Sequence, residues 1–149
     1  MLFRSEKGRY SEEAKFWLAQ SLDAAGQSDK AVEVFKEIAA TPAATRADAA
    51  QLQLANILFA KEQYQAAIEA YGRIEKEFPK SRHLPTAQLN AGYAFYQLGQ
   101  FANAMAAFDR AQKSEPVTVT AGYWKGLAAK ALGDFSGADR KSTRLNSSH

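Results

Sequence analysis

The sequence predicts an all-α protein, an α-α superhelix of antiparallel helix pairs. Three observations support this. Alanine fills 30 of the 149 positions, against 9 glycines and 4 prolines, a bias that favours helix. Apolar residues recur at spacings of three and four in FWLAQSL, LQLANILF and LNAGYAFY, as expected for amphipathic helices. The chain also repeats itself with a period of 34 to 37 residues, a length typical of stacked helical repeats.

The repeat is visible as columns of equivalent residues. One column holds alanines spaced by 36, 37 and 34 residues, namely Ala31, Ala67, Ala104 and Ala138. Five residues before each alanine stands a predicted turn residue, in order Gly26, Glu62, Gly99 and Gly133. Four residues after the first three alanines come the aromatic residues Phe35, Tyr71 and Phe108. Upstream lies a second column of small residues, Ala19, Ala55, Gly92 and Gly126. The periodicity therefore predicts two helices per repeat, separated by a tight turn.

The pattern places the first helix of each pair near 10–25, 46–60, 84–98 and 119–132. It places the second helices near 28–40, 64–77 and 101–114, with a truncated last one from 134. Ser81 is the expected N-cap of the third pair, leaving Pro85 in the opening turn, where proline is tolerated. Gly92 and Gly126 each cost about 1 kcal/mol against alanine inside a helix, so we expect close backbone contact at both.

This pattern resembles the tetratricopeptide repeat, a pair of antiparallel helices with small, aromatic and proline columns at these spacings. The resemblance implies a tetratricopeptide-repeat solenoid of about 3.5 repeats, covering approximately 10–43, 46–80, 82–117 and a truncated 118–138. The sequence departs from the family pattern in two respects. Glu62 replaces one turn glycine, and the tryptophan usual near the start of the first helix is replaced by Lys15, Gln51, Gln88 and Gly122.

The two ends of the chain look foreign to the repeat. Residues 139–149, DRKSTRLNSSH, resemble a translated sequencing adapter, and residues 1–5, MLFRS, resemble the same adapter read from the other strand. We therefore expect residues 6–138 to be an internal piece of a longer reading frame. Four of the 19 basic residues and one of the 16 acidic residues lie in these ends, which leaves 15 of each. The repeat region is then neutral, and no excess of basic charge predicts nucleic-acid binding.

Few residues in the sequence could carry catalysis. The chain has no cysteine, and the one histidine in the repeat region, His83, lies in a connection without a second metal-binding residue nearby. The carboxylate pairs Glu12–Glu13 and Glu75–Glu77 fall on amphipathic helices beside basic residues and are expected to be solvated. We therefore predict no catalytic, cofactor-binding or metal-binding residues, no enzymatic activity and no cofactor. No apolar run reaches the roughly 18 residues of a membrane span.

A binding surface is the more plausible functional feature. The resemblance implies a concave groove lined by the first helices, and a protein or peptide partner bound in it. Its expected lining residues are Gln20, Leu52, Asn56, Phe59, Leu89, Tyr93, Tyr96, Gln97, Tyr123 and Leu127. An amide among aromatic rings suits an extended peptide, with the amide on the peptide backbone and the rings on its side chains. The alternative is that these aromatic rings only fill the core of each repeat or cover its surface without binding a partner.

One family subtype is disfavoured by the sequence. Members that clamp a C-terminal carboxylate use two asparagines together with lysine and arginine on successive first helices. Asn56 and Asn90 fall at the two asparagine positions. Leu52, Thr120 and Trp124 fall where the cations should be, so a carboxylate would lose most of its charge-assisted hydrogen bonding.

The run EFPKSRHLPTAQLNAGYAFYQLGQFANAMAAF is similar to repeats of bacterial cell-envelope tetratricopeptide proteins, of the Tol-Pal coordinator and outer-membrane assembly lipoprotein type. This similarity implies a periplasmic location and a scaffolding role. Two alternatives stay open: the repeats are the regulatory arm of a larger enzyme or sensor, or they form a self-associating array. Repeats without polar caps expose apolar faces, so we also expect self-association through the ends at micromolar concentration.

Overall fold

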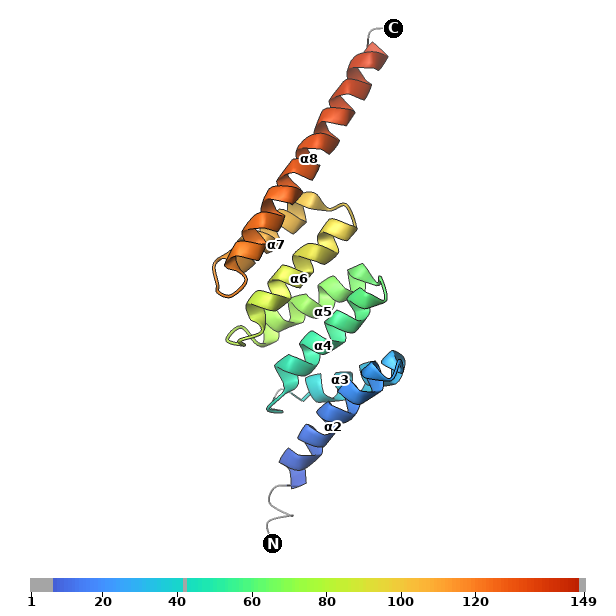
Figure 1. Ribbon diagram of the computed structural model, residues 1–149, viewed down its shortest axis with the longest axis vertical. Helices are drawn as coiled ribbons and strands as arrows, with labels where there is room; N and C mark the ends of the chain where they lie inside the picture. The colour runs from blue at the N-terminus through green and yellow to red at the C-terminus, as the bar shows by residue number, and fades with distance from the viewer. Residues whose placement is uncertain (1–6, 42, 148–149) are drawn as a thin grey trace.

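In a computed structural model, the chain folds into helices that follow one another along a single axis (Figure 1). The structure describes residues 7–41 and 43–147, and the side chains of residues 12–41 and 43–134. The expected segment 1–5 lies outside the described residues. The side chains of the expected segment 139–149 are likewise not described. The first and last described helices, α2 (Lys7–Ala24) and α8 (Thr118–Ser147), lie at opposite ends of the molecule (Figure 1).

Within these residues the structure contains helices and no strands, which confirms the predicted fold class. The first helices of successive pairs are α2 (Lys7–Ala24), α4 (Ala47–Ala60), α6 (Leu84–Gln97) and α8 (Thr118–Ser147). The second helices are α3 (Ser28–Ala39), α5 (Tyr64–Glu77) and α7 (Phe101–Gln112). Each helix packs mainly against its neighbours in sequence, as in a linear repeat array.

The turns inside the first three pairs have the same geometry. Gly26, Glu62 and Gly99 have φ values of +81°, +60° and +73°. In each turn the next residue donates its N–H to a carbonyl five residues earlier, as Gln63 does to Leu58 at 2.9 Å. Glu62 therefore occupies a left-handed conformation that glycine adopts without steric cost.

The predicted fourth turn, at Gly133, is wrong. The helix α8 runs through Gly133 without interruption, and its C-terminal part extends beyond the other helices (Figure 1). A second helix folds back only when it can bury an apolar face against the first. The segment DFSGADRKSTRLNS after Gly133 has few apolar residues, so continuing the helical hydrogen bonds is the more favourable outcome.

The capping prediction for the third pair is also wrong. The N-cap of α6 is His83 and not Ser81, although Pro85 does lie in the opening turn as expected. Ser81 lies just before the helix, where its hydroxyl accepts the N–H of His83 at 3.0 Å. The same hydroxyl donates to Asp48 of α4 at 2.6 Å, which ties this connection to the preceding repeat.

The core consists of three clusters, each centred between a second helix and the first helices on either side of it. The alanines of the repeat column are fully buried at Ala31, Ala67 and Ala104. The aromatic residue four positions later is buried beside them, as Phe35 is, with its ring 5.6 Å from that of Phe16. Small side chains at the helix crossings thus make room for one large ring in each pair.

The two glycines of the small-residue column, Gly92 and Gly126, differ in their surroundings. A Cβ on Gly92 would overlap the ring of Phe108, which confirms close contact at this position. Nothing lies within 4 Å of a Cβ on Gly126, so the expected close contact there is wrong. The reason is the missing fourth turn, because α8 continues past Gly133 and, among the described residues, no second helix of the last repeat packs against it at that position.

Candidate partner-binding surface

The predicted groove residues fall into three groups by exposure. Leu52 and Leu89 are buried in the core clusters and offer almost no surface to a partner. Gln97 and Tyr123 are exposed. The others are half-buried, namely Gln20, Asn56, Phe59, Tyr93, Tyr96 and Leu127. Gln20, Asn56, Tyr93 and Leu127 occupy the equivalent position of α2, α4, α6 and α8, and thus form one row along the array.

Asn56 is the most firmly oriented residue of this row. Its Oδ1 accepts a hydrogen bond from the Tyr71 hydroxyl of α5 at 2.7 Å and another from Asn90 Nδ2 of α6 at 3.1 Å. Burial raises the pKa of the Tyr71 phenol well above its usual value, so the hydroxyl stays protonated and remains a donor. With both lone pairs of Oδ1 engaged, Asn56 presents its amide N–H groups as its remaining hydrogen-bonding capacity.

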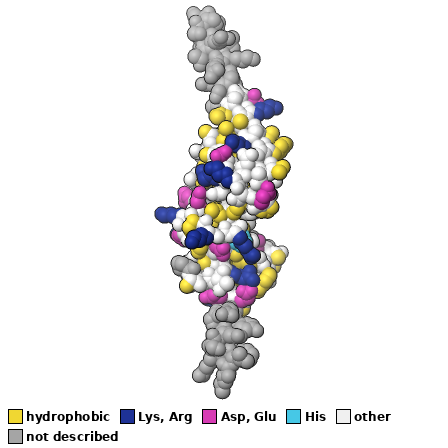
Figure 2. All heavy atoms as spheres, turned by 90° about the vertical axis from the view of Figure 1, so that its left-hand side faces the viewer, with side chains coloured by type: hydrophobic (Ala, Val, Ile, Leu, Met, Phe, Trp, Pro, Cys, Tyr) yellow, Lys and Arg dark blue, Asp and Glu magenta, His cyan; other side chains and the backbone are white. Residues whose placement is uncertain are grey.

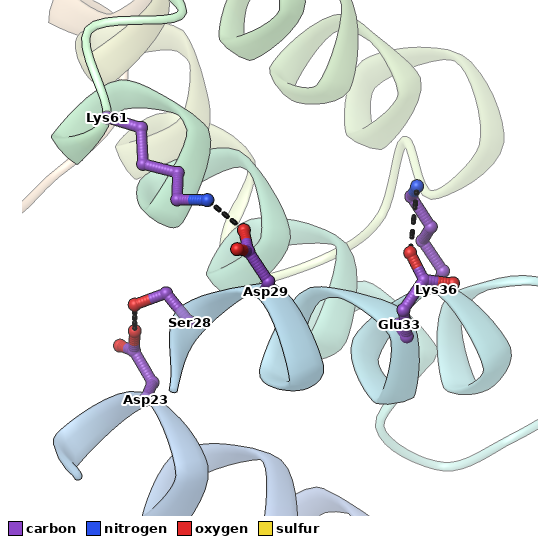
Figure 3. Close-up of polar contacts among 6 residues, drawn as sticks. All are labelled: Asp23, Ser28, Asp29, Glu33, Lys36 and Lys61. Atoms are coloured by element: carbon purple, nitrogen blue, oxygen red, sulfur yellow. Dashed lines mark hydrogen bonds and ion pairs between the residues drawn. The ribbon is translucent and has the colours of Figure 1, made fainter. Parts of the chain in front are cut away.

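A pocket of about 250 Å³ opens beside Asn56, at the junction of the first and second pairs. It is lined by Asp23, Ser28, Gln53, Asn56, Ile57, Ala60 and Lys61. Two polar contacts hold its rim (Figure 3): Ser28 donates to Asp23 at 2.7 Å, and Lys61 pairs with Asp29. The pocket therefore carries donors and acceptors and both signs of charge, a mixture that suits a peptide group better than a bare ion.

Aromatic residues gather at the other end of the row. The ring of Trp124 lies 5.0 Å from Tyr93 and 5.5 Å from Tyr96, in edge-to-face contact with both. Tyr123 precedes it on α8 and is 64% exposed. The tyrosine and tryptophan rings thus form a partly exposed surface that we call the aromatic platform, made of Tyr93, Tyr96, Tyr123 and Trp124.

Two of the predicted aromatic residues also pack on a ring of their own repeat. Tyr96 packs on Phe101 at 5.2 Å, and the equivalent pair one repeat earlier, Phe59 and Tyr64, packs at 5.3 Å. Each pair closes the turn between a first and a second helix. Trp124 was not among the predicted groove residues. It stands in the same repeat column as Asn90, and this equivalence was the signal in the sequence that could have identified it.

A larger pocket of about 480 Å³ lies where α3, α4 and α5 meet. Its wall includes Gln51, which is 2% exposed and donates to the carbonyl of Ala70 at 2.9 Å. Two cations line it, and each has an acidic partner: Lys36 pairs with Glu33, and Arg73 with Glu77. This pocket consequently has no unbalanced charge to attract an ion.

The distribution of charged side chains does not favour the binding of a polyanion such as a nucleic acid. On the face drawn in Figure 2, basic and acidic side chains alternate between apolar ones. Several pairs link neighbouring helices, such as Arg46 with Glu13 at 2.6 Å and Lys125 with Asp109 at 2.6 Å. Among the described residues, no group of three or more metal-ligating side chains is found. In that same part of the chain, no helix is long and apolar enough to cross a membrane.

Comparison with known proteins identifies relatives of this chain. The chain is similar over 53 residues, at 38% identity, to the outer membrane protein assembly factor BamD of Neisseria meningitidis serogroup B. That match covers 36% of this chain and 20% of the relative, so the chain spans about a fifth of the relative's length.

Two solved structures share the fold. One is a Podosopora anserina protein described as a kinesin light chain with nearly identical TPR-like repeats, with a TM-score of 0.66, 19% identity and coverage of 91% of this chain and 74% of the other. A single-substitution variant of that protein gives a TM-score of 0.65 at 20% identity, covering 89% of this chain and 71% of the other. These likenesses concern the fold alone.

The family model described as tetratricopeptide repeat matches the chain three times, over residues 18–82, 52–114 and 89–138. The matches overlap in steps of one repeat and together cover most of the chain, in agreement with the helix pairs described above. The chain belongs to the tetratricopeptide repeat family.

Proposed function

We propose that this chain is a protein-interaction scaffold that binds an extended segment of a partner protein along the row Gln20, Asn56, Tyr93 and Leu127. The observation that carries the proposal is the hydrogen bonding of Asn56. Tyr71 and Asn90 both donate to its Oδ1, so its amide N–H groups remain as donors for a backbone carbonyl of the partner. The orientation is set before binding, which lowers the entropic cost of association.

The two ends of the row supply specificity in this proposal. The pocket beside Asn56 accommodates a polar group, and the aromatic platform accommodates an apolar side chain. Leu52 and Leu89 are left out of the proposed surface because they are buried. Their role is to position α4 and α6.

The test starts from a phage-displayed peptide library selected on the full chain. A selected peptide is labelled, and its affinity for the variants is measured by fluorescence anisotropy. Asn56→Asp keeps an oxygen for Tyr71 and Asn90 but removes the amide donors. We expect affinity to fall by about tenfold or more, equivalent to about 1.4 kcal/mol, while the thermal midpoint changes little.

Val119→Ala is the matched control, because Val119 lies on α8 and is 80% exposed outside the proposed row. Its affinity should equal that of the unaltered chain. The proposal is wrong if the selected peptides bind Asn56→Asp and Tyr123→Ala as tightly as the unaltered chain. It is equally wrong if the full chain retains no more phage than the heat-unfolded chain does.

We further propose that the protein works in the bacterial cell envelope. The support is the 53-residue similarity to an outer membrane protein assembly factor. An antibody against the chain, applied to fractionated cells of the source organism, should detect the protein in the periplasmic or outer-membrane fraction. Recovery in the cytoplasmic fraction alone would contradict this location.

A further inference from the structure

The outward face of α2 carries an uncharged stripe that no other described part of the fold covers. Ala14, Leu18 and Ser21 lie at helical spacing on this face and are all exposed. Leu18 is 52% exposed, which makes it one of the most exposed large apolar residues among those described.

The equivalent positions of the later first helices are covered. At the position of Ala14 the later helices have Ala50, Ala87 and Ala121, which are all buried. At the position of Ser21 they have Ile57, Ala94 and Ala128, again all buried.

The equivalents of Leu18 in the later first helices show which helix covers this position. Its equivalent in α4, Leu54, is buried in a cluster with Phe35 and Ile38 of α3, and its equivalent in α6, Ala91, is buried in a cluster with residues of α5. In α8 the equivalent is Lys125, which pairs with Asp109 of α7 at 2.6 Å. In each of these three cases the residue is buried in one cluster with the second helix of the preceding repeat or pairs with that helix.

We propose that the stripe of α2 is the same inter-repeat interface and that one more helix pair of this repeat, N-terminal to α2 in the same polypeptide, packs its second helix against Leu18. The interface continues an established one, and its stripe of small and apolar residues permits the close helix approach seen at the three later junctions. A second copy of the chain fits less well, because α3, α5 and α7 each already lie between two first helices.

Two extended chains test this proposal. In the first, residues 46–83 are repeated directly ahead of Ser11, so that a copy of α5 precedes α2 in the register with which α5 precedes α6. In the second, residues 81–117 are repeated ahead of Ser11, so that a copy of α7 precedes α2 as α7 precedes α8. Each extension should raise the thermal midpoint of unfolding by about 5 °C or more.

Leu18→Lys separates the proposal from its alternatives. In the first extended chain it should lower the midpoint by about 5 °C or more, because a charge is buried against the copy of α5. In the second it should be tolerated, because the copied Asp109 faces the new lysine as Asp109 faces Lys125. In the unextended chain it should change the midpoint little, and Val119→Lys should be neutral in all three chains.

Two results would overturn the inference. One is that Leu18→Lys shifts the midpoint equally in the unextended and both extended chains. The other is that the unextended chain sediments as a dimer that Leu18→Lys dissociates, while neither extension adds stability. In that event the stripe is an interface between copies.

Discussion

Gly92 of α6 lies directly against the ring of Phe108 of α7, and a Cβ at position 92 would come closer than 3.0 Å to three carbons of that ring. Phe108 is fully buried in a cluster that also includes Leu89, Ala104 and Ala121, so the ring has little room to move. The contact joins the two columns that define the repeat, the small residue of the first helix and the aromatic residue of the second.

Replacing this glycine should therefore destabilise the protein in spite of alanine's better helix propensity. We expect Gly92→Ala to lower the free energy of unfolding by about 1–3 kcal/mol through overpacking. Gly126→Ala is the matched control, because nothing lies within 4 Å of its Cβ, and it should stabilise by up to about 1 kcal/mol. Urea denaturation of both variants measures the two changes in the free energy of unfolding. Equal effects at the two glycines would contradict the packing described.

The buried alanine column makes a second prediction. Ala67 and Ala104 have no exposed surface, so Ala67→Leu and Ala104→Leu should each cost about 1–3 kcal/mol of stability. Ala102→Leu, on the exposed side of α7, should change stability by less than about 0.5 kcal/mol. Thermal unfolding followed by circular dichroism compares them. An unchanged midpoint for Ala104→Leu would count against the repeat alignment.

The left-handed turn at Glu62 leads to a third prediction. Its φ of +60° lies where Gly26 and Gly99 stand in the neighbouring turns, and a side chain there costs about 1–2 kcal/mol. Glu62→Gly should relieve this strain and raise the free energy of unfolding by about 1 kcal/mol. Gln63→Gly, one residue later and outside the left-handed region, should not stabilise. A loss of stability in Glu62→Gly would show that the glutamate makes a compensating contact.

Stability should also depend on pH through two inter-helix ion pairs. A hydrogen bond from Arg46 lowers the pKa of Glu13, and one from Lys125 lowers the pKa of Asp109. Because both carboxyls have a lower pKa folded than unfolded, their contribution is present at neutral pH and is lost as the pH falls below about 4.

The variant carrying Glu13→Gln and Asp109→Asn measures this contribution. Its thermal midpoint should lie below that of the unaltered chain at pH 7, and the two midpoints should converge as the pH falls through the lowered pKa values of the two carboxyls. Both carboxyls are well exposed, so the difference should be modest and should shrink in high salt. A difference that stays constant from pH 7 to pH 3 would show that the two pairs do not titrate as described.

Much of the proposed binding surface could not be predicted from the repeat register alone. The register correctly marks Asn56 and Tyr93 as equivalent positions of successive first helices, but it places Leu52 and Leu89 on the same surface although both are buried. The register also left Trp124 outside the predicted groove. Which face of a helix stays exposed depends on the size of the side chains on the neighbouring helix, and a single helix pattern does not contain that information.

The helix pairs, their order and the first three turns follow from the sequence alone, because local periodicity, turn residues and the spacing of small and aromatic columns specify them. Three further points needed the packing of whole repeats: the unbroken α8, the orientation of Asn56 by Tyr71 and Asn90, and the uncovered stripe around Leu18. Each of these depends on whether another helix is present to bury an apolar face or complete a hydrogen bond. That is a property of contacts between repeats, and no single repeat encodes it.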